Sequence, residues 1–174
     1  MPNDVRAVLL TGPIGAGKTA VAMELGELLA ERNLPTAVID LDWLGWFHGP
    51  PDGPSPNELI ATNLRAIWPT FQEAGASHLV LARAVTSRAD VDVIRSALDG
   101  VELTVVLVSA SPDVIAERLA RRDEGEVLRQ HLEESEQMSE ALARAGLEDV
   151  RIENGDGSAR EAAQDLLEAL SWGP

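Results

Sequence analysis

Residues 9–21 read LLTGPIGAGKTAV and contain Lys18, the only lysine of the 174-residue chain. Lys and Arg together number 14, so the other 13 basic residues are arginine. Arginine replaces lysine readily on a solvated surface, but not in a site shaped for a compact ammonium group on a flexible stem. The retained lysine therefore indicates a functional position, although a GC-rich genome that drifts from lysine to arginine could leave its last lysine anywhere.

The segment Gly12–Thr19 fits the pattern G-x-x-x-x-G-K-[ST]. It follows an apolar run, Val5–Leu10, that predicts a buried strand, and it opens a stretch with helical spacing that runs to Arg32. Backbone N–H groups of such a loop surround a phosphate, and the helix N-terminus adds positive potential. We expect Lys18 to reach the outer phosphates and the Thr19 hydroxyl to ligate Mg²⁺. The predicted nucleotide-binding residues here are Gly12, Pro13, Ile14, Gly15, Ala16, Gly17, Lys18, Thr19 and Ala20.

Composition limits the other possibilities. The length suits one domain, 1–174, and the chain has no cysteine, so a disulfide framework or thiolate metal site is excluded. A net charge of −15 without a basic stripe makes nucleic acid and anionic membranes poor partners. No apolar run reaches membrane-spanning length, and the first residues lack the basic region of a secretion signal. We expect a cytoplasmic protein, monomeric or homodimeric.

Apolar runs and capping signals predict alternating strands and helices. Further strands are predicted at Thr36–Leu41, His78–Ala82, Leu103–Val108 and Val150–Ile152. Helices are predicted from Pro56 to about Trp68, where Pro69 interrupts, at Ser87–Leu98, from Pro112 through Arg122, at Glu126–Ala145, and from Ser158 to near Trp172. Strands that are apolar on both faces and alternate with helices indicate a five-stranded parallel sheet covered on both sides.

With this element order, the phosphate loop and the acidic pair Asp40-Leu41-Asp42, the chain resembles the small-molecule kinases of the P-loop superfamily. This group contains shikimate, gluconate and adenylylsulfate kinases. The resemblance covers almost the full length and implies a three-layer α/β P-loop NTPase fold with strand order 2-3-1-4-5. It also implies ATP and Mg²⁺ as cofactors, an acceptor-binding region at about 43–75, a short lid at about 121–130, and an adenine-contacting loop after the last strand.

The same resemblance assigns two arginines and one asparagine to the nucleotide. Arg118 and Arg122 resemble the arginines that precede and enter the lid, where one commonly stacks on adenine and another touches phosphates. Arg121 competes with Arg122 for this role, and a solvated helix face explains the same residues. Asn154 opens the segment NGDGS, which occupies the place of the adenine loop but would also suit a plain turn.

Two departures from the family pattern affect the metal and the acceptor. The third strand lacks the terminal Asp of many P-loop NTPases, so Mg²⁺ would depend on Thr19 and, through water, on Asp40. The glycine-rich segment expected after this strand in shikimate kinases is also missing, so shikimate itself is not supported. Arg83 stands there instead, where it either holds an anionic acceptor or stabilises transferred charge, or pairs with a nearby acid.

Asp42 is the predicted base for the acceptor hydroxyl. Residues two apart on a strand point to the same side, so both carboxylates of the acidic pair can face the site. One of them could instead cap the following loop. The next residues, Trp43, Trp46 and His48, and Arg65 on the following helix, are the other predicted acceptor-binding residues, with core packing as the alternative for the aromatic ones.

The sequence thus predicts an ATP- and Mg²⁺-dependent phosphotransferase that acts on a hydroxyl group of a small metabolite or antibiotic. The partners expected are a nucleotide and a small-molecule acceptor. The alternative is a nucleotide-binding regulatory protein or a stand-alone NTPase that transfers phosphate only to water.

Overall fold

The computed structural model describes residues 5–155 and 157–172. The two ends of the domain predicted over 1–174, and residue 156 of the predicted adenine loop, therefore lie outside the described residues. The elements are β1 (Arg6–Thr11), α1 (Lys18–Glu31), β2 (Thr36–Asp40), α2 (Asp42–Gly45), α3 (Pro56–Glu73), β3 (His78–Ala82), α4 (Arg88–Ser96), β4 (Glu102–Ser109), α5 (Pro112–Ala120), α6 (Gly125–Ala145), β5 (Val150–Glu153) and α7 (Ala159–Ala169).

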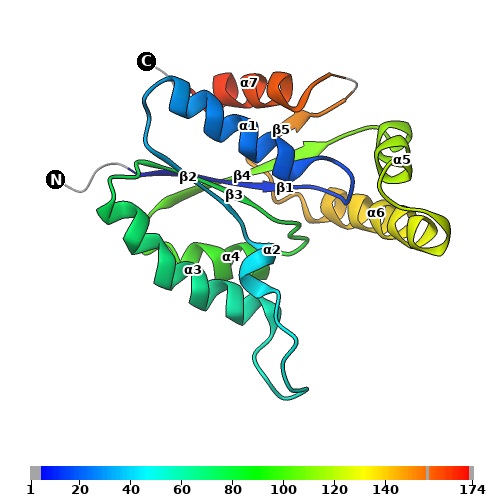
Figure 1. Cartoon of the computed structure of the whole chain (residues 1–174), viewed down its shortest axis with the longest axis horizontal. Coiled ribbons are helices and arrows are strands. Elements are labelled where there is room, and N and C mark those ends of the chain that lie inside the picture. Colours follow the sequence, from blue (N-terminus) through cyan, green and yellow to red (C-terminus); the bar gives the residue numbers. More distant parts are fainter. Residues whose placement is uncertain (1–4, 156, 173–174) are drawn as a thin grey trace.

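The five strands form one parallel sheet in the order β2-β3-β1-β4-β5, which confirms the predicted topology. Helices α1 and α7 cover one face of the sheet, and α3 and α4 cover the other (Figure 1). The result is the predicted three-layer arrangement.

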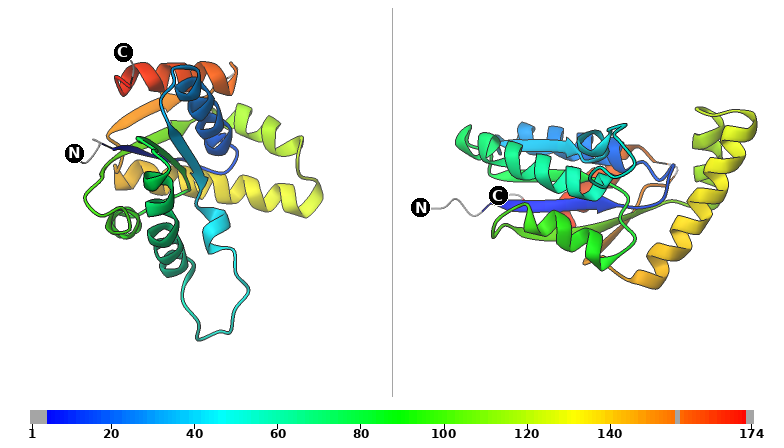
Figure 2. Two further views of the ribbon diagram at one scale, coloured as in Figure 1. Left: turned by 60° about the vertical axis from the view of Figure 1, so that its left-hand side comes forward. Right: turned by 90° about the horizontal axis from the view of Figure 1, so that it is seen from below.

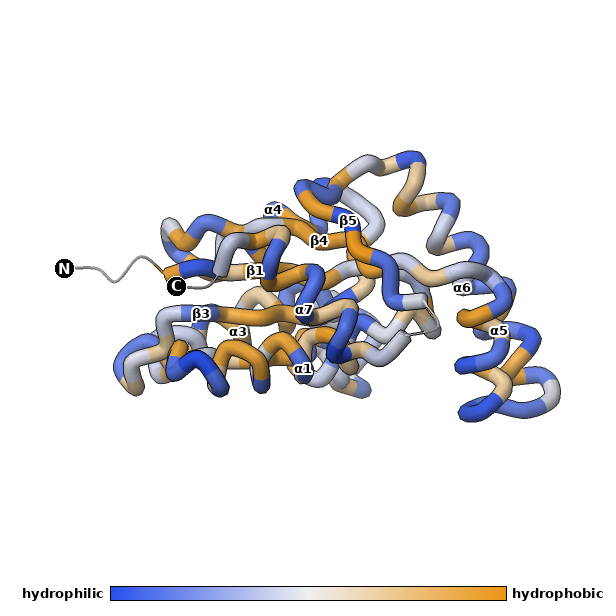
Figure 3. The backbone as a smooth tube through the Cα atoms, turned by 90° about the horizontal axis from the view of Figure 1, so that it is seen from above, coloured by the Kyte–Doolittle hydropathy of each residue, from blue (hydrophilic) through white to orange (hydrophobic). Residues whose placement is uncertain are grey.

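The central strand β1 explains why both faces need a helix layer. Its alternate residues point to opposite faces, so Ala7 and Leu9 pack in the core under α3 and α4, whereas Val8 and Leu10 pack under α1 and α7. All four side chains are at most 1% exposed. Figure 3 shows the same distribution, with hydrophobic colour along the strands and hydrophilic colour concentrated on the outer helices.

Helices α5 and α6 form a hairpin that stands off the carboxyl end of the sheet, on the side where β1 enters the phosphate loop (Figure 2). The residues that join the two helices are 121–124, so residues 125–130 of the predicted lid form the first turns of α6. Among the described residues, no helix is both long enough and apolar enough to cross a membrane.

The helix predicted to stop near Trp68 continues to Glu73, so the prediction of an interruption at Pro69 is wrong. Pro69 removes the N–H that would bond to the carbonyl of Arg65. Both residues are exposed, so water can satisfy that carbonyl, while Leu64 and Trp68 on the buried face anchor the helix.

Candidate active site

The phosphate loop connects the end of β1 to the start of α1, as predicted. Gly17 has a left-handed backbone (φ 88°) immediately before the helix begins at Lys18. A Cβ at Gly12 would lie 2.2 Å from the carbonyl oxygen of Val108, so only glycine lets the loop pass this close to β4. The path of the loop therefore depends on the glycines of the motif.

The N-terminus of α1 is open to an anion. Within the described part of the chain, α1 has neither a side-chain N-cap nor an acidic residue in its first turn. Helices α3, α4, α5 and α7 each carry both, with serine at the N-cap. Because the first N–H groups of a helix have no partner inside it, those of α1 are available to a phosphate.

Three carbonyl groups of the loop accept hydrogen bonds from side chains, most of which lie outside the motif. The carbonyl oxygen of Ala16 accepts hydrogen bonds from Nδ2 of Asn154 at 2.8 Å and from Arg118 at 3.3 Å. The carbonyl of Ile14 accepts from Oγ of Ser135 on α6 at 2.7 Å, and that of Pro13 accepts from Nζ of Lys18 at 3.0 Å. Carbonyls repel phosphate, so these bonds favour a loop that presents its N–H groups inward.

Arg118 and Asn154, both predicted from the resemblance, are thus brought together at the loop. Arg118 also donates to the carbonyl of Gly155 at 2.8 Å, in the segment predicted as the adenine loop. Asn154 is 3% exposed and is fixed further by a 2.7 Å bond from its backbone N–H to Ser109. Their observed contacts support the loop, and their predicted contact with adenine stays a prediction.

Ser135 was not predicted as a site residue from the sequence. It lies on α6 in line with the apolar positions Leu128, Leu132, Met138 and Leu142, and it is 2% exposed. A polar residue inside an apolar helix stripe is the signal that could have drawn attention to it, because a buried hydroxyl needs a partner.

Lys18 lies among charged groups of both signs. Burial lowers its pKa from 10.5 to about 8, and Arg122 adds to the decrease, whereas Asp42 and Asp40 oppose it. An ammonium group that is partly stripped of water gains more from an incoming phosphate than a solvated one does.

Thr19 and Asp40, the two predicted metal ligands, are hydrogen-bonded to each other. The Thr19 hydroxyl donates to Oδ2 of Asp40 at 2.8 Å, and Oδ1 of Asp40 accepts the backbone N–H of Asp42 at 3.1 Å. Hydroxyl and carboxylate oxygens suit Mg²⁺, which keeps several waters and uses phosphates as further ligands. Among the described residues no group of three His, Cys, Asp or Glu side chains could hold a metal ion alone. The donors present therefore fit Mg²⁺ bound together with a nucleotide.

The expectation that both acids lie on one strand is wrong. Strand β2 ends at Asp40, and Asp42 is the first residue of the short helix α2. The turn at Leu41 nevertheless brings Asp42 toward the phosphate loop, because Asp42 lines a cavity of about 410 Å³ together with Lys18 and Arg122.

Asp42 belongs to a chain of polar contacts across the carboxyl end of the sheet. Its Oδ1 lies 3.6 Å from Nε of Arg83, and Arg83 donates to Oδ1 of Asn57 at 2.7 Å. Nδ2 of Asn57 in turn donates to Asp90 at 2.6 Å. The alternative that Arg83 pairs with an acid is thus observed, and Asn57 and Asp90, which fix Arg83, were not identified from the sequence.

The pKa of Asp42 is raised, first by partial burial and then by the neighbouring carboxylate of Asp40, while Arg83 and Lys18 oppose the rise. The Asp42 side chain is still 64% exposed, so water weakens these effects. A carboxylate with a raised pKa accepts a proton more readily than an ordinary one.

Arg122 and Arg121, which competed for one role, point to different surroundings. Arg122 lines the cavity and donates to Asp123, which also lies 2.7 Å from Nδ1 of His131 on α6. Hydrogen bonds from Arg122 and His131 lower the pKa of Asp123 to about 2. Arg121 forms an ion pair with Glu117 instead.

The predicted acceptor-binding residues are spread more widely. Trp43 and Trp46 on and after α2 stack on each other with ring centroids 5.3 Å apart, and Nε1 of Trp46 lies 3.3 Å from Nε2 of His48. All three are exposed, so the alternative of core packing does not apply to the two tryptophans. Arg65 is exposed on α3, and no hydrogen bond or ion pair joins it to the site within the described residues.

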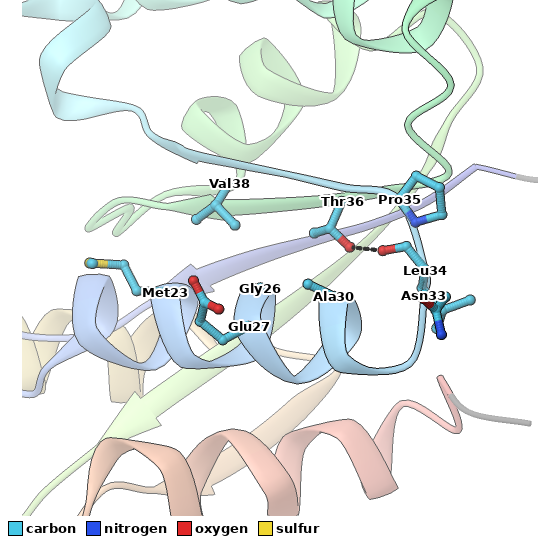
Figure 4. A pocket seen from close by; sticks show the side chains of 9 residues that line it. All are labelled: Met23, Gly26, Glu27, Ala30, Asn33, Leu34, Pro35, Thr36 and Val38. Carbon is cyan, nitrogen blue, oxygen red and sulfur yellow. Dashed lines mark hydrogen bonds between the residues drawn. The ribbon is translucent and has the colours of Figure 1, made fainter.

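A second cavity, of about 540 Å³, lies between α1 and the edge strand β2 (Figure 4). Its lining includes Met23, Gly26, Ala30 and Val38, and none of the predicted site residues line it. Its lining contains Glu27 and no lysine or arginine, so it offers no cation to a phosphate, whereas the cavity at the phosphate loop contains Lys18, Arg118 and Arg122.

Comparison with known proteins agrees with this geometry. A family described as an AAA domain matches residues 8–139. No curated protein sequence matches the chain. The structure is similar to the shikimate kinase from Acinetobacter baumannii in complex with shikimate, with a TM-score of 0.64 and 21% identity over 98% of this chain and 95% of that one.

Two further solved structures are similar over nearly their whole length. The gluconokinase from Sinorhizobium meliloti has a TM-score of 0.65 and 20% identity, over 97% of this chain and 93% of that one. The APS kinase from Mycobacterium tuberculosis, in complex with AMPPNP and APS, has a TM-score of 0.59 and 22% identity, over 98% and 99%. The resemblance to P-loop small-molecule kinases is thereby confirmed at the level of the fold.

Proposed function

This chain belongs to the AAA domain family, and from that premise we propose that it is an ATP- and Mg²⁺-dependent phosphotransferase that acts on a hydroxyl group of a small metabolite or antibiotic. The observation that carries the proposal is the cavity that joins Lys18 and Arg122 to Asp42. A lysine of the phosphate loop and a carboxylate that line one cavity suit transfer to a second substrate.

Lys18 and the N–H groups at the start of α1 bind the outer phosphates. Thr19 and Asp40 hold Mg²⁺, which when bound neutralises charge on the phosphate oxygens. Arg122 at the rim of the cavity adds positive charge toward the transferred group. Most of the work asked of these residues is positioning and charge stabilisation, as in other phosphoryl transfers.

Asp42 orients the acceptor hydroxyl and takes its proton as the oxygen bonds to the transferred phosphorus and ADP leaves. Arg83, which is anchored by Asn57, holds the Asp42 carboxylate toward the cavity. Because its pKa is raised, Asp42 is a stronger base than an ordinary carboxylate.

The test has two stages. Thermal melting with and without Mg²⁺ and ADP or ATP first measures nucleotide binding, since a ligand of the folded state raises its stability. ADP release is then measured across a library of hydroxylated metabolites and antibiotics. A nucleotide-induced shift together with one or more stimulating acceptors supports a kinase. Steady ATP consumption that no acceptor stimulates favours the NTPase alternative, and an unmoved melting temperature contradicts both.

A further inference from the structure

The most exposed aromatic side chains of the described chain follow Asp42 closely in the sequence. The Trp43 and Trp46 residues are 71% and 67% exposed, and Phe47 is 60% exposed. The two indoles are nearly parallel, with an interplanar angle of 12°. Each outer face of the stacked pair is therefore a flat apolar surface in water, which is a common mark of a binding site.

The stacked pair is held on a fixed support. Helix α2 packs on α3, where Nδ2 of Asn63 donates to the carbonyl of Leu44 at 2.7 Å. Gly45 lies so close to α3 that a Cβ there would be 2.8 Å from Ile60. The position of the indoles relative to Asp42, one residue before Trp43, is thus set by packing between helices. The loop that follows extends away from the sheet (Figure 1).

Positive charge is scarce on this side of the site. The sequence holds no lysine or arginine between Arg32 and Arg65, whereas Asp52 and Glu58 fall within that stretch. The cations near Asp42 are Arg83, whose side chain is 16% exposed and already bonded to Asn57, and Lys18 and Arg122, which line the cavity with Asp42 and are assigned to the phosphates. A carboxylate or sulfate on the acceptor would meet Asp42 and the net charge of −15 without a free counter-charge beside the indoles.

We infer that the acceptor is a neutral or cationic alcohol with a flat apolar ring, which stacks on the Trp43–Trp46 pair and presents its hydroxyl to Asp42. A cationic group gains from the indole faces and from the acidic surroundings. The inference rests on the proposed phosphotransfer and names the chemical class of its acceptor.

Three probes of one shape test the inference: 4-methylbenzyl alcohol, 4-(aminomethyl)benzyl alcohol and 4-(hydroxymethyl)benzoate, which are neutral, cationic and anionic. Their binding is followed by ligand-observed NMR titration in the presence of Mg²⁺ and ADP. The neutral and cationic probes should bind at least about fivefold more tightly than the anionic one. Tightest binding of the benzoate, or no binding of any probe, overturns the inference.

Variants locate the binding. The double variant Trp43→Ala/Trp46→Ala should weaken the neutral probe about two- to tenfold, and Trp43→Phe/Trp46→Phe should restore most of the loss. Phe71→Ala is the matched control, because Phe71 is 39% exposed on α3 and lies outside the stack. Equal effects of the alanine double variant and the control would contradict the assignment.

Protection by ADP against heat, measured on wild type and on each variant, separates a failure of the proposed function from a failure of the proposed acceptor class. If ADP fails to protect wild type, the proposed function itself is wrong. If ADP protects and the probes ignore the tryptophans, only the acceptor class is wrong. Light scattering tests whether the indoles instead bind a second copy of the chain. A wild-type dimer that dissociates in the alanine double variant would show this, and it would also overturn the inference.

Discussion

The two sides of the candidate site are built in different ways. On the phosphate side, three consecutive segments of the fold donate hydrogen bonds to loop carbonyls, through Arg118, Ser135 and Asn154. On the proposed acceptor side, the exposed and stacked pair Trp43 and Trp46 follows the carboxylate of Asp42 in the chain. The phosphate side is thus held by hydrogen bonds within the protein, while the acceptor side offers exposed surface that a ligand would cover.

This difference predicts whether a substitution should change turnover or nucleotide binding. A change on the acceptor side should alter turnover and leave nucleotide binding intact, because Asp42 and the indoles do not support the loop. A change on the phosphate side should alter nucleotide binding, and its size should depend on whether the side chain meets the phosphates or only supports the loop. Each experiment below either separates the two sides or shows that they are coupled.

The largest effect is expected at Asp42. Asp42→Asn keeps the shape but removes the base, so turnover with a stimulating acceptor should fall about 10²–10⁴-fold. ADP affinity by calorimetry should stay within a few-fold of wild type. Asp52→Asn, in the exposed loop, is the control and should change neither. Full phosphotransfer by Asp42→Asn would exclude this residue as the base.

Substitutions of Lys18 should have the next largest effect, and this effect should be on the affinity for ADP. Charge-assisted hydrogen bonds contribute about 1.5–3 kcal/mol, so Lys18→Ala should weaken ADP about 10- to 150-fold in calorimetry. Lys18→Arg should bind nearly as poorly, because a planar guanidinium does not fit where a compact ammonium group contacts the loop. Arg144→Ala removes a cation from the exposed end of α6 and is the control. Strong ADP binding by Lys18→Arg would refute this account of the lone lysine.

Much of the phosphate side could be predicted from the sequence because it is local. Gly12–Thr19 is one continuous segment, and its position between a strand and a helix follows from hydrophobic pattern alone. Asp40 and Asp42 were also predicted, from the acidic pair that the family resemblance places at the end of the second strand, although Asp42 proved to lie on α2. Strand order came from the family resemblance and agrees with the structure.

The remaining parts depend on contacts between distant segments. Ser135 is 121 residues from its partner Ile14, and Asn57 is 26 residues from Arg83. No local sequence pattern predicts hydrogen bonds between residues so far apart in the chain. Helix α3 likewise continues through Pro69 because packing of its buried face outweighs one lost backbone bond, which a rule based on proline alone does not include.

The pH dependence of binding tests the charge on the phosphate side. The pKa of Lys18 is lowered to about 8, so from pH 8 to 9.5 a growing fraction of the folded protein is neutral at Nζ. ADP binding favours the charged form, and its affinity should fall by up to about tenfold per pH unit above 8. ADP titrations at successive pH values measure this decline, and Lys18→Met should flatten it.

Folding stability should respond to Lys18 in the opposite direction. Between about pH 8 and the ordinary lysine value of 10.5, the unfolded chain binds more protons at this residue than the folded chain does. The contribution of Lys18 to the free energy of unfolding should therefore rise with pH across that window. Denaturant unfolding of wild type and Lys18→Met gives the difference, and a contribution that falls with pH would show that the pKa of Lys18 is not lowered.

The smallest effect is expected at Ser135, and it tests whether loop support matters at all. Ser135→Ala leaves the Ile14 carbonyl without its 2.7 Å donor, so the loop gains freedom to turn that carbonyl toward the phosphates. We expect ADP affinity to fall about three- to tenfold. Ser139→Ala is a close control, because Ser139 lies one turn further along α6 and donates only to the Ser135 carbonyl of the same helix. Both substitutions raise helix propensity equally, so any difference in ADP affinity between them reports the bond from α6 to the phosphate loop. Equal affinities would mean that the loop keeps its shape without α6, and that the contrast between an organised phosphate side and an open acceptor side depends on Arg118 and Asn154 alone.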